Sequence, residues 1–267
     1  MKTRHPIFSS LELLFIKFLE TLRTPREARF EIKPLDTRGY LAAGGSGVVY
    51  GIDAKSVRKE FYEDEARRVE CEVYERLGTH PRIAKLLEVR EDGSLILERG
   101  TSLRKILEGR PAQEIPIQTK VKWLKDAAKG YLYLHSLKII HADVGWHNWI
   151  LTAEQRVKLI DFEGCSVDGK DSRSCYEWFS NSRITSGVSE QTDMFAFGCA
   201  VYELVTGKPP HYEQITCQDR SIRVDELYAN GEYPDVTHLP LCNLIQNCWS
   251  GAMGSMAEIV RELEAFH

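Results

Sequence analysis

Two apolar stretches with polar residues between or after them decide how this sequence is interpreted. Residues 139–151 have the sequence IIHADVGWHNWIL, and residues 157–161 have the sequence VKLID. The apolar parts are typical of short buried strands, so the polar residues fall in turns or at strand ends. Asp143 could accept a proton from a substrate hydroxyl, while Asn148 and Asp161 offer oxygen ligands of the kind that Mg²⁺ binds. The pattern therefore predicts a site for a reaction at a hydroxyl group beside a magnesium ion.

A glycine-rich stretch lies upstream of these two. Residues 41–51 read LAAGGSGVVYG and fall where one strand should end and the next begin. Gly44, Gly45 and Gly47 would let the backbone approach a ligand closely, and backbone N–H groups exposed in such a turn can hold an anion. A tight hairpin needs the same glycines, so this stretch alone leaves both interpretations open.

Lys59 and Glu70 are predicted to face each other in the interior. Lys59 ends a short β-like run and would direct one cation toward the glycine-rich turn. Glu70 lies on the next predicted helix, on the same face as Val73 and Leu77, so its carboxylate can face inward. An unpaired buried charge is costly, and an inward lysine and an inward carboxylate therefore need each other.

The secondary-structure patterns change along the chain from β-rich to helical. Short β-like runs are predicted at 47–52, 56–59, 83–89 and 95–98, around one charged helix at 63–77. Farther along, Ser102 can cap a short helix, and longer helices are predicted at 119–136 and 194–205. The last of these is apolar except for Glu203, which indicates a helix buried on all sides.

These patterns predict an α+β fold of two lobes, a small β-rich lobe with one main helix and a larger, mostly α-helical lobe. The expected boundaries are an N-terminal extension at 1–24, the β-rich lobe at 25–98, a hinge at 99–101 and the helical lobe at 102–267. A cleft between two lobes is a common place for a ligand.

Composition excludes several classes of function. The charges, 35 Lys and Arg against 39 Asp and Glu, give a net charge of −4, so no basic field favours nucleic acid as a partner. The seven cysteines include no C-x-x-C pair, which fits a reducing compartment and an intracellular location, cytoplasmic or nuclear. No window reaches the roughly 18 apolar residues that a membrane-spanning helix needs, so no transmembrane segment is expected.

The first part of the chain is predicted to form an amphipathic helix. Residues 11–22, LELLFIKFLETL, carry apolar residues at helical spacing. A membrane-surface helix would have Lys or Arg along its polar face, but only Lys17 and Arg23 are available here. Packing against the body of the protein, or docking of a partner protein, is therefore the favoured interpretation over membrane binding.

Together the motifs resemble those of the eukaryotic protein kinase family, from about residue 40 to the C-terminus. The glycine loop G-x-G-x-x-G-x-V of that family matches 42–49, with Ala42 in place of the first glycine, and HADVGWHN at 141–148 matches H-R-D-L-x-x-x-N. D-F-G matches Asp161 and the two residues after it, while TDMFAFG at 192–198 and Cys248-Trp249 resemble landmarks of the large lobe. The resemblance is to a divergent member, with H-A-D rather than H-R-D.

The resemblance implies an ATP-dependent protein kinase that uses Mg²⁺ and transfers the γ-phosphoryl group to a protein hydroxyl. It implies that Asp143 is the catalytic base, that Lys59 held by Glu70 orients the phosphates, and that Asn148 and Asp161 bind the metal. The residues implied to contact ATP are Ala42, Gly44, Gly45, Ser46, Gly47, Val49, Lys59, Leu97, Glu98 and Gly100, with the backbone of 98–100 bonding the adenine. Asp193 is expected to bond the backbone of the catalytic loop, and His141 to pack rather than to catalyse.

Several positions depart from the family pattern. Ala142 replaces the arginine that binds an activation-segment phosphate in many members, so control by phosphorylation of that segment is not expected. Gly145 occupies a position where serine/threonine kinases usually carry a lysine. His147 occupies a position where tyrosine kinases usually carry an arginine. Neither substrate class has its usual marker, so serine or threonine is expected on frequency alone. Glu163 replaces the glycine of D-F-G, and no clear A-P-E motif follows.

These departures keep two alternatives open. A pseudokinase would retain the fold, bind nucleotide or a partner, and have no chemical need for the complete set of Lys59, Glu70, Asp143, Asn148 and Asp161. A small-molecule phosphotransferase of the aminoglycoside or choline kinase type also has H-x-D-x-x-x-x-N and D-x-E patterns. The large-lobe landmarks at 192–198 and 248–249 argue against the second alternative.

Overall fold

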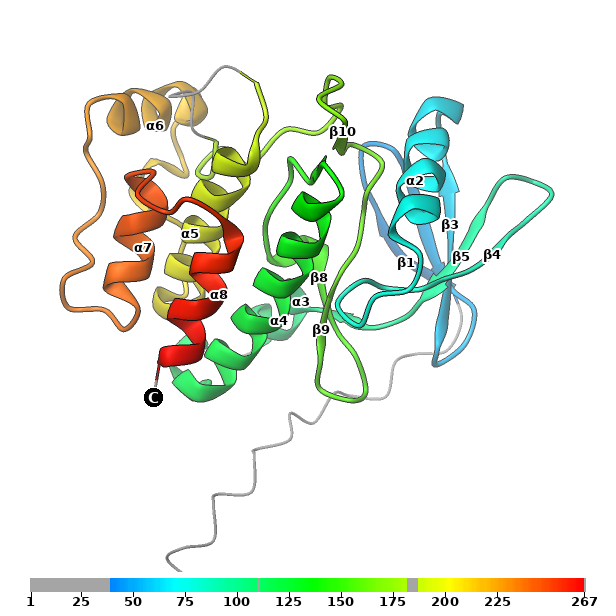
Figure 1. Cartoon of the computed structure of the whole chain (residues 1–267), viewed down its shortest axis with the longest axis horizontal. Helices are drawn as coiled ribbons and strands as arrows, with labels where there is room; N and C mark the ends of the chain where they lie inside the picture. Colours follow the sequence, from blue (N-terminus) through cyan, green and yellow to red (C-terminus); the bar gives the residue numbers. More distant parts are fainter. Residues whose placement is uncertain (1–38, 110, 182–186, 267) are drawn as a thin grey trace, which may run out of the picture. The chain divides into compact units, whose positions relative to one another are not determined.

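The computed structural model describes residues 39–109, 111–181 and 187–266, all of which belong to one compact unit, Pro34–His267. This unit has a sheet-bearing lobe and a helical lobe (Figure 1), and the predicted two-lobed α+β fold is confirmed. The amphipathic helix expected at 11–22 lies outside the described residues.

The small lobe is built on a five-stranded antiparallel sheet with the strand order β1-β2-β3-β5-β4. Its strands are β1 (Gly39–Ala43), β2 (Gly47–Gly51), β3 (Ser56–Phe61), β4 (Leu86–Val89) and β5 (Leu95–Glu98). The strand predicted at 83–89 is shorter than expected, because Ile83 forms an isolated bridge with Leu159 of the large lobe instead of joining this sheet.

Helix α2 (Asp64–Leu77) accompanies the sheet, as the charged pattern at 63–77 predicted. Asp64 and Glu65 lie in its first turn, where negative charge is favourable, and Gly78 ends it with a φ of 54° that suits glycine. Its buried face consists of Ala66, Glu70, Val73, Tyr74 and Leu77. Glu70 is thus a carboxylate within an otherwise largely apolar face.

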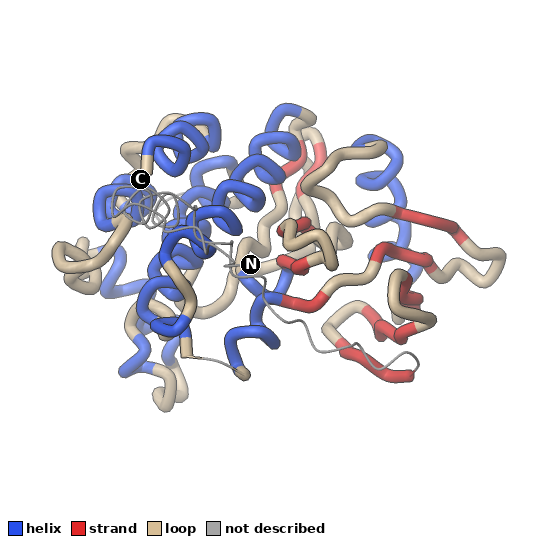
Figure 2. Tube along the Cα trace, turned by 90° about the horizontal axis from the view of Figure 1, so that it is seen from below, coloured by secondary structure: helices blue, strands red, loops and turns tan. Residues whose placement is uncertain are grey.

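The large lobe consists mainly of helices, with two small sheets among its described residues. Its helices are α3 (Leu103–Glu108), α4 (Ile117–Ser136), α5 (Glu190–Thr206), α6 (Arg220–Ala229), α7 (Cys242–Trp249) and α8 (Met256–Ala265). The strands are β6 (Thr101–Ser102), β7 (Ile139–Ile140), β8 (Trp149–Leu151), β9 (Val157–Leu159) and β10 (Ser166–Val167), paired as β6-β8-β9 and β10-β7. Helix α4 packs against α8 and α5 against α7, and Figure 2 shows these helices on the side opposite the five-stranded sheet.

Helix α5 is the central helix of this lobe, and it is longer than the predicted 194–205. Ser189 and Thr192 form a reciprocal capping box at its start, and Gly207 ends it in the left-handed conformation. The expected cap at Ser102 is only partly right. Ser102 occupies the N-cap position of α3, but its hydroxyl is directed to the carbonyl of Trp146 at 3.5 Å and caps no helix N–H.

None of the helices within the described residues is both long enough and apolar enough to cross a membrane. The seven cysteines at positions 71, 165, 175, 199, 217, 242 and 248 are all free thiols.

Asp126 on α4 joins this helix to the chain at Arg156 and Val157 and to Arg82, which precedes β4. Its buried carboxylate accepts hydrogen bonds from Arg156 Nε at 2.8 Å, Arg156 Nη2 at 2.7 Å and the Val157 N–H at 3.1 Å, and Arg82 Nε lies at 3.0 Å. The Asp126→Ala variant should lower the free energy of unfolding by about 3–5 kcal/mol, because it leaves cations beside a buried site without their carboxylate.

Lys129→Ala is the matched control in urea denaturation. Lys129 lies on the same helix as Asp126 and forms an exposed ion pair with Glu264 of α8. Its loss should cost less than about 1 kcal/mol of unfolding free energy. Equal losses in the two variants would show that the buried network does not stabilise the lobe.

Candidate active site

Lys59 is the centre of a buried ion cluster between the two lobes. Its Nζ atom lies 2.5 Å from Glu70 Oε2, 2.5 Å from Asp161 Oδ1 and 2.6 Å from Glu163 Oε2. Strand β3, helix α2 and the segment after β9 each contribute to it. Burial alone would lower the pKa of Lys59, but Asp161, Glu70 and Glu163 outweigh it and raise that pKa well above its usual value. Lys59 is therefore a fixed cation.

The three carboxylates around Lys59 outnumber the one cation. Their oxygens lie within 4.8 Å of one another. Burial raises the pKa of Glu70 to about 7 against the attraction of Lys59, and burial also raises the pKa of Glu163. The pKa of Asp161 is lowered instead, because the attraction of Lys59 more than offsets the effect of burial. The cluster carries excess negative charge whenever all three carboxylates are ionised.

Asp143 and Asn148 face each other in the loop between β7 and β8. The Asn148 side-chain amide donates to Asp143 Oδ2 and to the Asp143 carbonyl, both at 2.9 Å. Asn148 lies in a short 3₁₀ turn (Trp146–Asn148), and its backbone carbonyl accepts from the Ile160 N–H, the residue before Asp161, at 3.1 Å. The structure thus ties the two expected metal-binding residues together through adjacent backbone.

The donor set suits a magnesium ion. Asp161 offers a carboxylate, and the Asn148 amide is oriented by its two bonds to Asp143, so that its side-chain oxygen is the atom available to a cation. Mg²⁺ is usually held in proteins by one or two such oxygens together with phosphate and water. Glu163 adds a carboxylate that the family pattern does not include.

His147 contacts Asp143, and no pattern in the sequence predicts this contact. Its Nε2 lies 3.0 Å from Asp143 Oδ1, and its Nδ1 lies 3.5 Å from Glu177 Oε2, which also accepts from Arg104 Nη2 at 2.6 Å. Burial would lower the pKa of His147, but hydrogen bonds and charge from Asp143 and Glu177 raise it to about 9. Burial would raise the pKa of Glu177, but hydrogen bonds and charge from His147 and Arg104 bring it down to about 2. A cation thus stands beside Asp143.

The His147 ring packs directly against Gly145, which has no side chain to displace it. A Cβ atom at Gly145 would lie 2.6 Å from His147 Cε1 and 2.8 Å from Nδ1, closer than real Cβ contacts. The absence of a side chain at 145 was therefore the one sequence signal for this contact. It is weak by itself, because glycines in loops have many causes.

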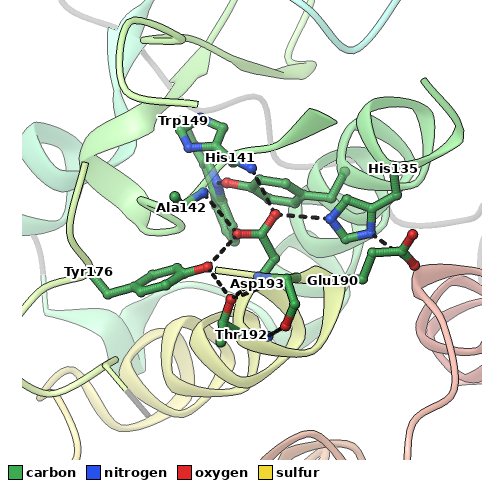
Figure 3. Close-up of polar contacts among 10 residues, drawn as sticks. His135, His141, Ala142, Trp149, Tyr176, Glu190, Thr192 and Asp193 are labelled. Atoms are coloured by element: carbon green, nitrogen blue, oxygen red, sulfur yellow. Dashed lines mark hydrogen bonds and ion pairs between the residues drawn. The ribbon is translucent and has the colours of Figure 1, made fainter. Parts of the chain in front are cut away.

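Asp193 at the start of α5 holds the backbone of the catalytic loop (Figure 3). Its Oδ2 accepts from the His141 N–H and from His135 Nε2, both at 2.9 Å. Its Oδ1 accepts from the Ala142 N–H at 3.0 Å and from the Tyr176 hydroxyl at 2.8 Å. Ala142 has a φ of 64°, a conformation that side-chain-bearing residues rarely adopt. The expected role of Asp193 is confirmed, because its bonds fix this unusual turn directly before Asp143.

His141 packs, as expected, rather than facing the site. Its ring meets those of Tyr131 and Phe162 edge-on at centroid distances of 5.6 Å, and its Nε2 lies 3.1 Å from the Ile160 carbonyl. Phe162 in turn contacts Tyr74 of α2 edge-on at 5.3 Å. This aromatic series connects the catalytic loop to the helix that carries Glu70.

The glycine-rich turn contacts the ion cluster through Ser46. The Gly44 N–H donates to the Gly47 carbonyl at 3.0 Å, which closes the turn, and the Ser46 hydroxyl donates to Glu163 Oε1. Gly47 is required by strand pairing, because a Cβ there would overlap the Glu60 carbonyl, whereas Gly44 and Gly45 face open space. Ala42 and Val49 are cross-strand partners in β1 and β2 directly beside the turn. Room for a ligand is thus found at Gly44 and Gly45.

The expected hinge is firmly braced. Leu97 is buried in β5, and the Glu98 carboxylate pairs with Lys158 Nζ at 2.7 and 2.8 Å. The Glu98 N–H donates to the Lys85 carbonyl, and the Arg99 N–H donates to the Lys55 carbonyl. The adenine of a bound nucleotide would therefore have to bond other backbone groups of the hinge. A Cβ at Gly100 would lie 2.9 Å from the Leu151 carbonyl, so only glycine allows this close approach to β8.

Comparison with known proteins gives a consistent result. A family model described as the protein kinase domain matches residues 45–254. A serine/threonine/tyrosine-protein kinase from Arabidopsis thaliana is 28% identical over 155 residues, which are 56% of this chain and 40% of that protein. A probable serine/threonine-protein kinase from Dictyostelium discoideum is 33% identical over 157 residues, 54% of this chain and 31% of that protein.

An Aurora kinase from Xenopus laevis is 27% identical over 218 residues, which are 72% of this chain and 53% of that protein. In each case this chain spans about half or less of the length of the curated relative that it matches.

The Gly145→Ala variant should displace the His147 ring and lower the free energy of unfolding by about 1–3 kcal/mol, the usual cost of overpacking. In a His147→Ala background the same change should cost less than about 0.5 kcal/mol, because the ring is no longer there. Urea denaturation of the four proteins of this double-mutant cycle measures both costs. Equal costs in the two backgrounds would contradict the packing of His147 against Gly145.

Glu203 on α5 should make stability depend on pH. Burial, assisted by the charge of Glu177, raises the pKa of Glu203 to about 7. Between the unfolded pKa near 4.5 and about 7, the folded protein binds more protons than the unfolded chain, so the contribution of Glu203 to stability falls as pH rises.

Relative to wild type, Glu203→Gln should therefore gain about 1–3 kcal/mol of unfolding free energy at pH 8 and little at pH 4.5. Denaturation of both proteins across this range measures the difference, which cancels the contributions of other groups. A difference that stays constant with pH would show that folding does not shift the pKa of Glu203.

Proposed function

This chain belongs to the protein kinase family, and on that basis we propose that it transfers the γ-phosphoryl group of ATP to a hydroxyl group of a protein substrate. One observation carries the proposal. Five residues from separate parts of the sequence form two connected groups between the lobes. Lys59 pairs with Glu70 and Asp161, and Asn148 bonds Asp143. A backbone hydrogen bond from Ile160, the residue before Asp161, to Asn148 joins the two groups. Phosphoryl transfer depends on such positioning and on charge stabilisation rather than on a covalent intermediate.

Each residue has a distinct task in this proposal. Lys59, fixed in place by Glu70, orients the phosphates beneath the turn at Gly44 and Gly45. Asp143 accepts the hydrogen bond and then the proton of the substrate hydroxyl. Mg²⁺, held by Asn148 and Asp161, would neutralise charge on the phosphates. The remaining ATP contacts proposed from the family pattern are Ala42, Ser46, Gly47, Val49, Leu97, Glu98 and Gly100.

The contacts of Asp143 shape this mechanism. Both of its carboxylate oxygens have partners, Oδ1 with His147 and Oδ2 with Asn148. A substrate hydroxyl must therefore share one of these oxygens, and the neighbouring partners fix the direction from which it can approach. Such fixed geometry lowers the entropic cost of reaching the reactive arrangement.

Serine or threonine is the proposed acceptor, since both residues appear in the names of two relatives, one of which is also named for tyrosine. We further propose an intracellular location, cytoplasmic or nuclear, in keeping with the seven free cysteines.

Phosphotransfer from ATP to generic protein substrates tests the proposal. The Asp143→Asn variant should lower kcat by about 10²–10⁴-fold, the usual contribution of a positioned general base. Its stabilisation by Mg²⁺ and ATP should persist at about 2.7 kcal/mol when the ligand is at a hundred times its Kd. Asp171→Asn, at an exposed position, is the matched control and should transfer at the wild-type rate.

The alternatives give different results in the same assays. Stabilisation by Mg²⁺ and ATP without any transfer would indicate a pseudokinase. Transfer to choline or an aminoglycoside but to no protein would indicate a small-molecule phosphotransferase. Transfer that Asp143→Asn leaves unchanged would refute the assigned base.

A further inference from the structure

The segment after Glu163 folds into a closed loop at 164–174. The Gly164 carbonyl accepts hydrogen bonds from the Ser172 hydroxyl at 2.7 Å, the Arg173 N–H at 3.1 Å and the Ser174 N–H at 3.3 Å. A Cβ at Gly164 would overlap the side chain of Ser174, so glycine is needed for this closure. The loop is therefore closed by hydrogen bonds within its own length.

The inner side of this loop is attached to the large lobe. Its strand β10 pairs with β7, and the Asp168 N–H donates to the Lys138 carbonyl at 3.0 Å. The same β7 leads directly into the catalytic loop. The position of the loop is thus set by the same strand that positions Asp143.

The outer side of the loop meets helix α2 through three ion pairs, which we call the ion-pair seam. Asp168 pairs with Arg76 at 2.8 Å, Lys170 pairs with Glu72 at 3.2 Å, and Arg173 pairs with Glu63. The helix residues run from its N-cap to its last turn. Arg76 also reaches the Leu137 carbonyl of the large lobe at 3.4 Å. The seam therefore spans nearly the whole length of α2.

The seam acts on the helix that carries Glu70. The Glu70 carboxylate pairs with Lys59, so a rotation or outward shift of α2 would break the centre of the ion cluster. In many family members an arginine directly before the residue that matches Asp143 binds a phosphate on this loop. Here that position is Ala142, which cannot bind a phosphate in this way. The loop instead contributes three charges to the seam, two positive and one negative, and each faces an opposite charge on α2 or at its N-cap.

We propose that the ion-pair seam holds α2 in the position that pairs Glu70 with Lys59, so that the site is assembled without a phosphate on the loop. The kinetic consequence rests on the proposed kinase function, whereas the effect on α2 does not. Single exposed ion pairs contribute little, but three of them between the same loop and the same helix add together. Their half-exposed positions make the seam sensitive to salt.

Charge reversal with restoration tests the seam. Lys170→Glu with Arg173→Glu turns two attractions into repulsions, and adding Glu63→Arg with Glu72→Arg restores opposite charges. The control, Arg223→Glu with Arg261→Glu, makes the same change in net charge at exposed positions on α6 and α8. All variants are made in the full chain, and hydrogen exchange of the α2 amides is measured together with phosphotransfer.

We expect the reversed variant to exchange the α2 amides about three- to tenfold faster, and to transfer phosphate more slowly by a similar factor. The restored variant should recover most of both losses, and the control should match wild type. Wild type treated with phosphatase should keep its α2 protection and its transfer rate.

Three results would overturn the proposal. The α2 amides could exchange equally in wild type and the reversed variant, which would show that the apolar face of α2 suffices. The restored variant could remain as exchange-prone as the reversed one, or phosphatase treatment could remove the protection. Absence of phosphotransfer in wild type would count against the proposed function alone, since the exchange measurement decides on the seam independently.

Discussion

The buried ammonium of Lys59 is the contact on which the rest of the site depends. It joins a strand of the small lobe, helix α2 and the segment after β9 through Glu70, Asp161 and Glu163. Removing any one carboxylate changes the charge around a cation that has almost no access to water. A buried charge of this kind keeps its partners close because separation would leave it uncompensated. The relative positions of three elements therefore follow from one side chain.

Two further constraints place the catalytic loop against that cluster. Asp193 accepts four hydrogen bonds from around the turn at His141 and Ala142, and burial makes these bonds costly to lose. His147 and Asn148 then direct the carboxylate of Asp143. The loop at 164–174 reaches from this region to α2, so the two halves of the site are connected by this loop as well as by the ion cluster.

The sequence predicted much of this arrangement because its strongest signals are local. The inward face of α2, the pairing of Lys59 with Glu70 and the largely buried α5 follow from helical spacing and from the cost of an unpaired charge. The strand at 83–89 was overestimated, because its apolar pattern could not show that Ile83 faces Leu159 of the other lobe. Ser102 was read as a cap, but its hydroxyl is directed to a carbonyl across the loop.

Contacts between exposed or irregular segments could not be predicted in the same way. The charges at Glu63, Glu72 and Arg76 look like an ordinary solvated helix face until the loop at 164–174 is placed beside them. Ser46 and Glu163 lie 117 residues apart, and no periodicity links them. His147 follows Asp143 in a turn that has no regular spacing, so its contact depends on the missing side chain at Gly145.

The central claim is that this cluster is a site for a nucleotide together with a magnesium ion. Titration calorimetry of ATP binding to the wild-type chain, once with saturating Mg²⁺ and once with EDTA, tests it most directly. The phosphates would lie beside Asp143, Asp161 and Glu163, so without the cation they meet uncompensated negative charge. We expect ATP to bind at least about tenfold more tightly with Mg²⁺. Equal affinity in both conditions, or no binding with Mg²⁺, would contradict the account.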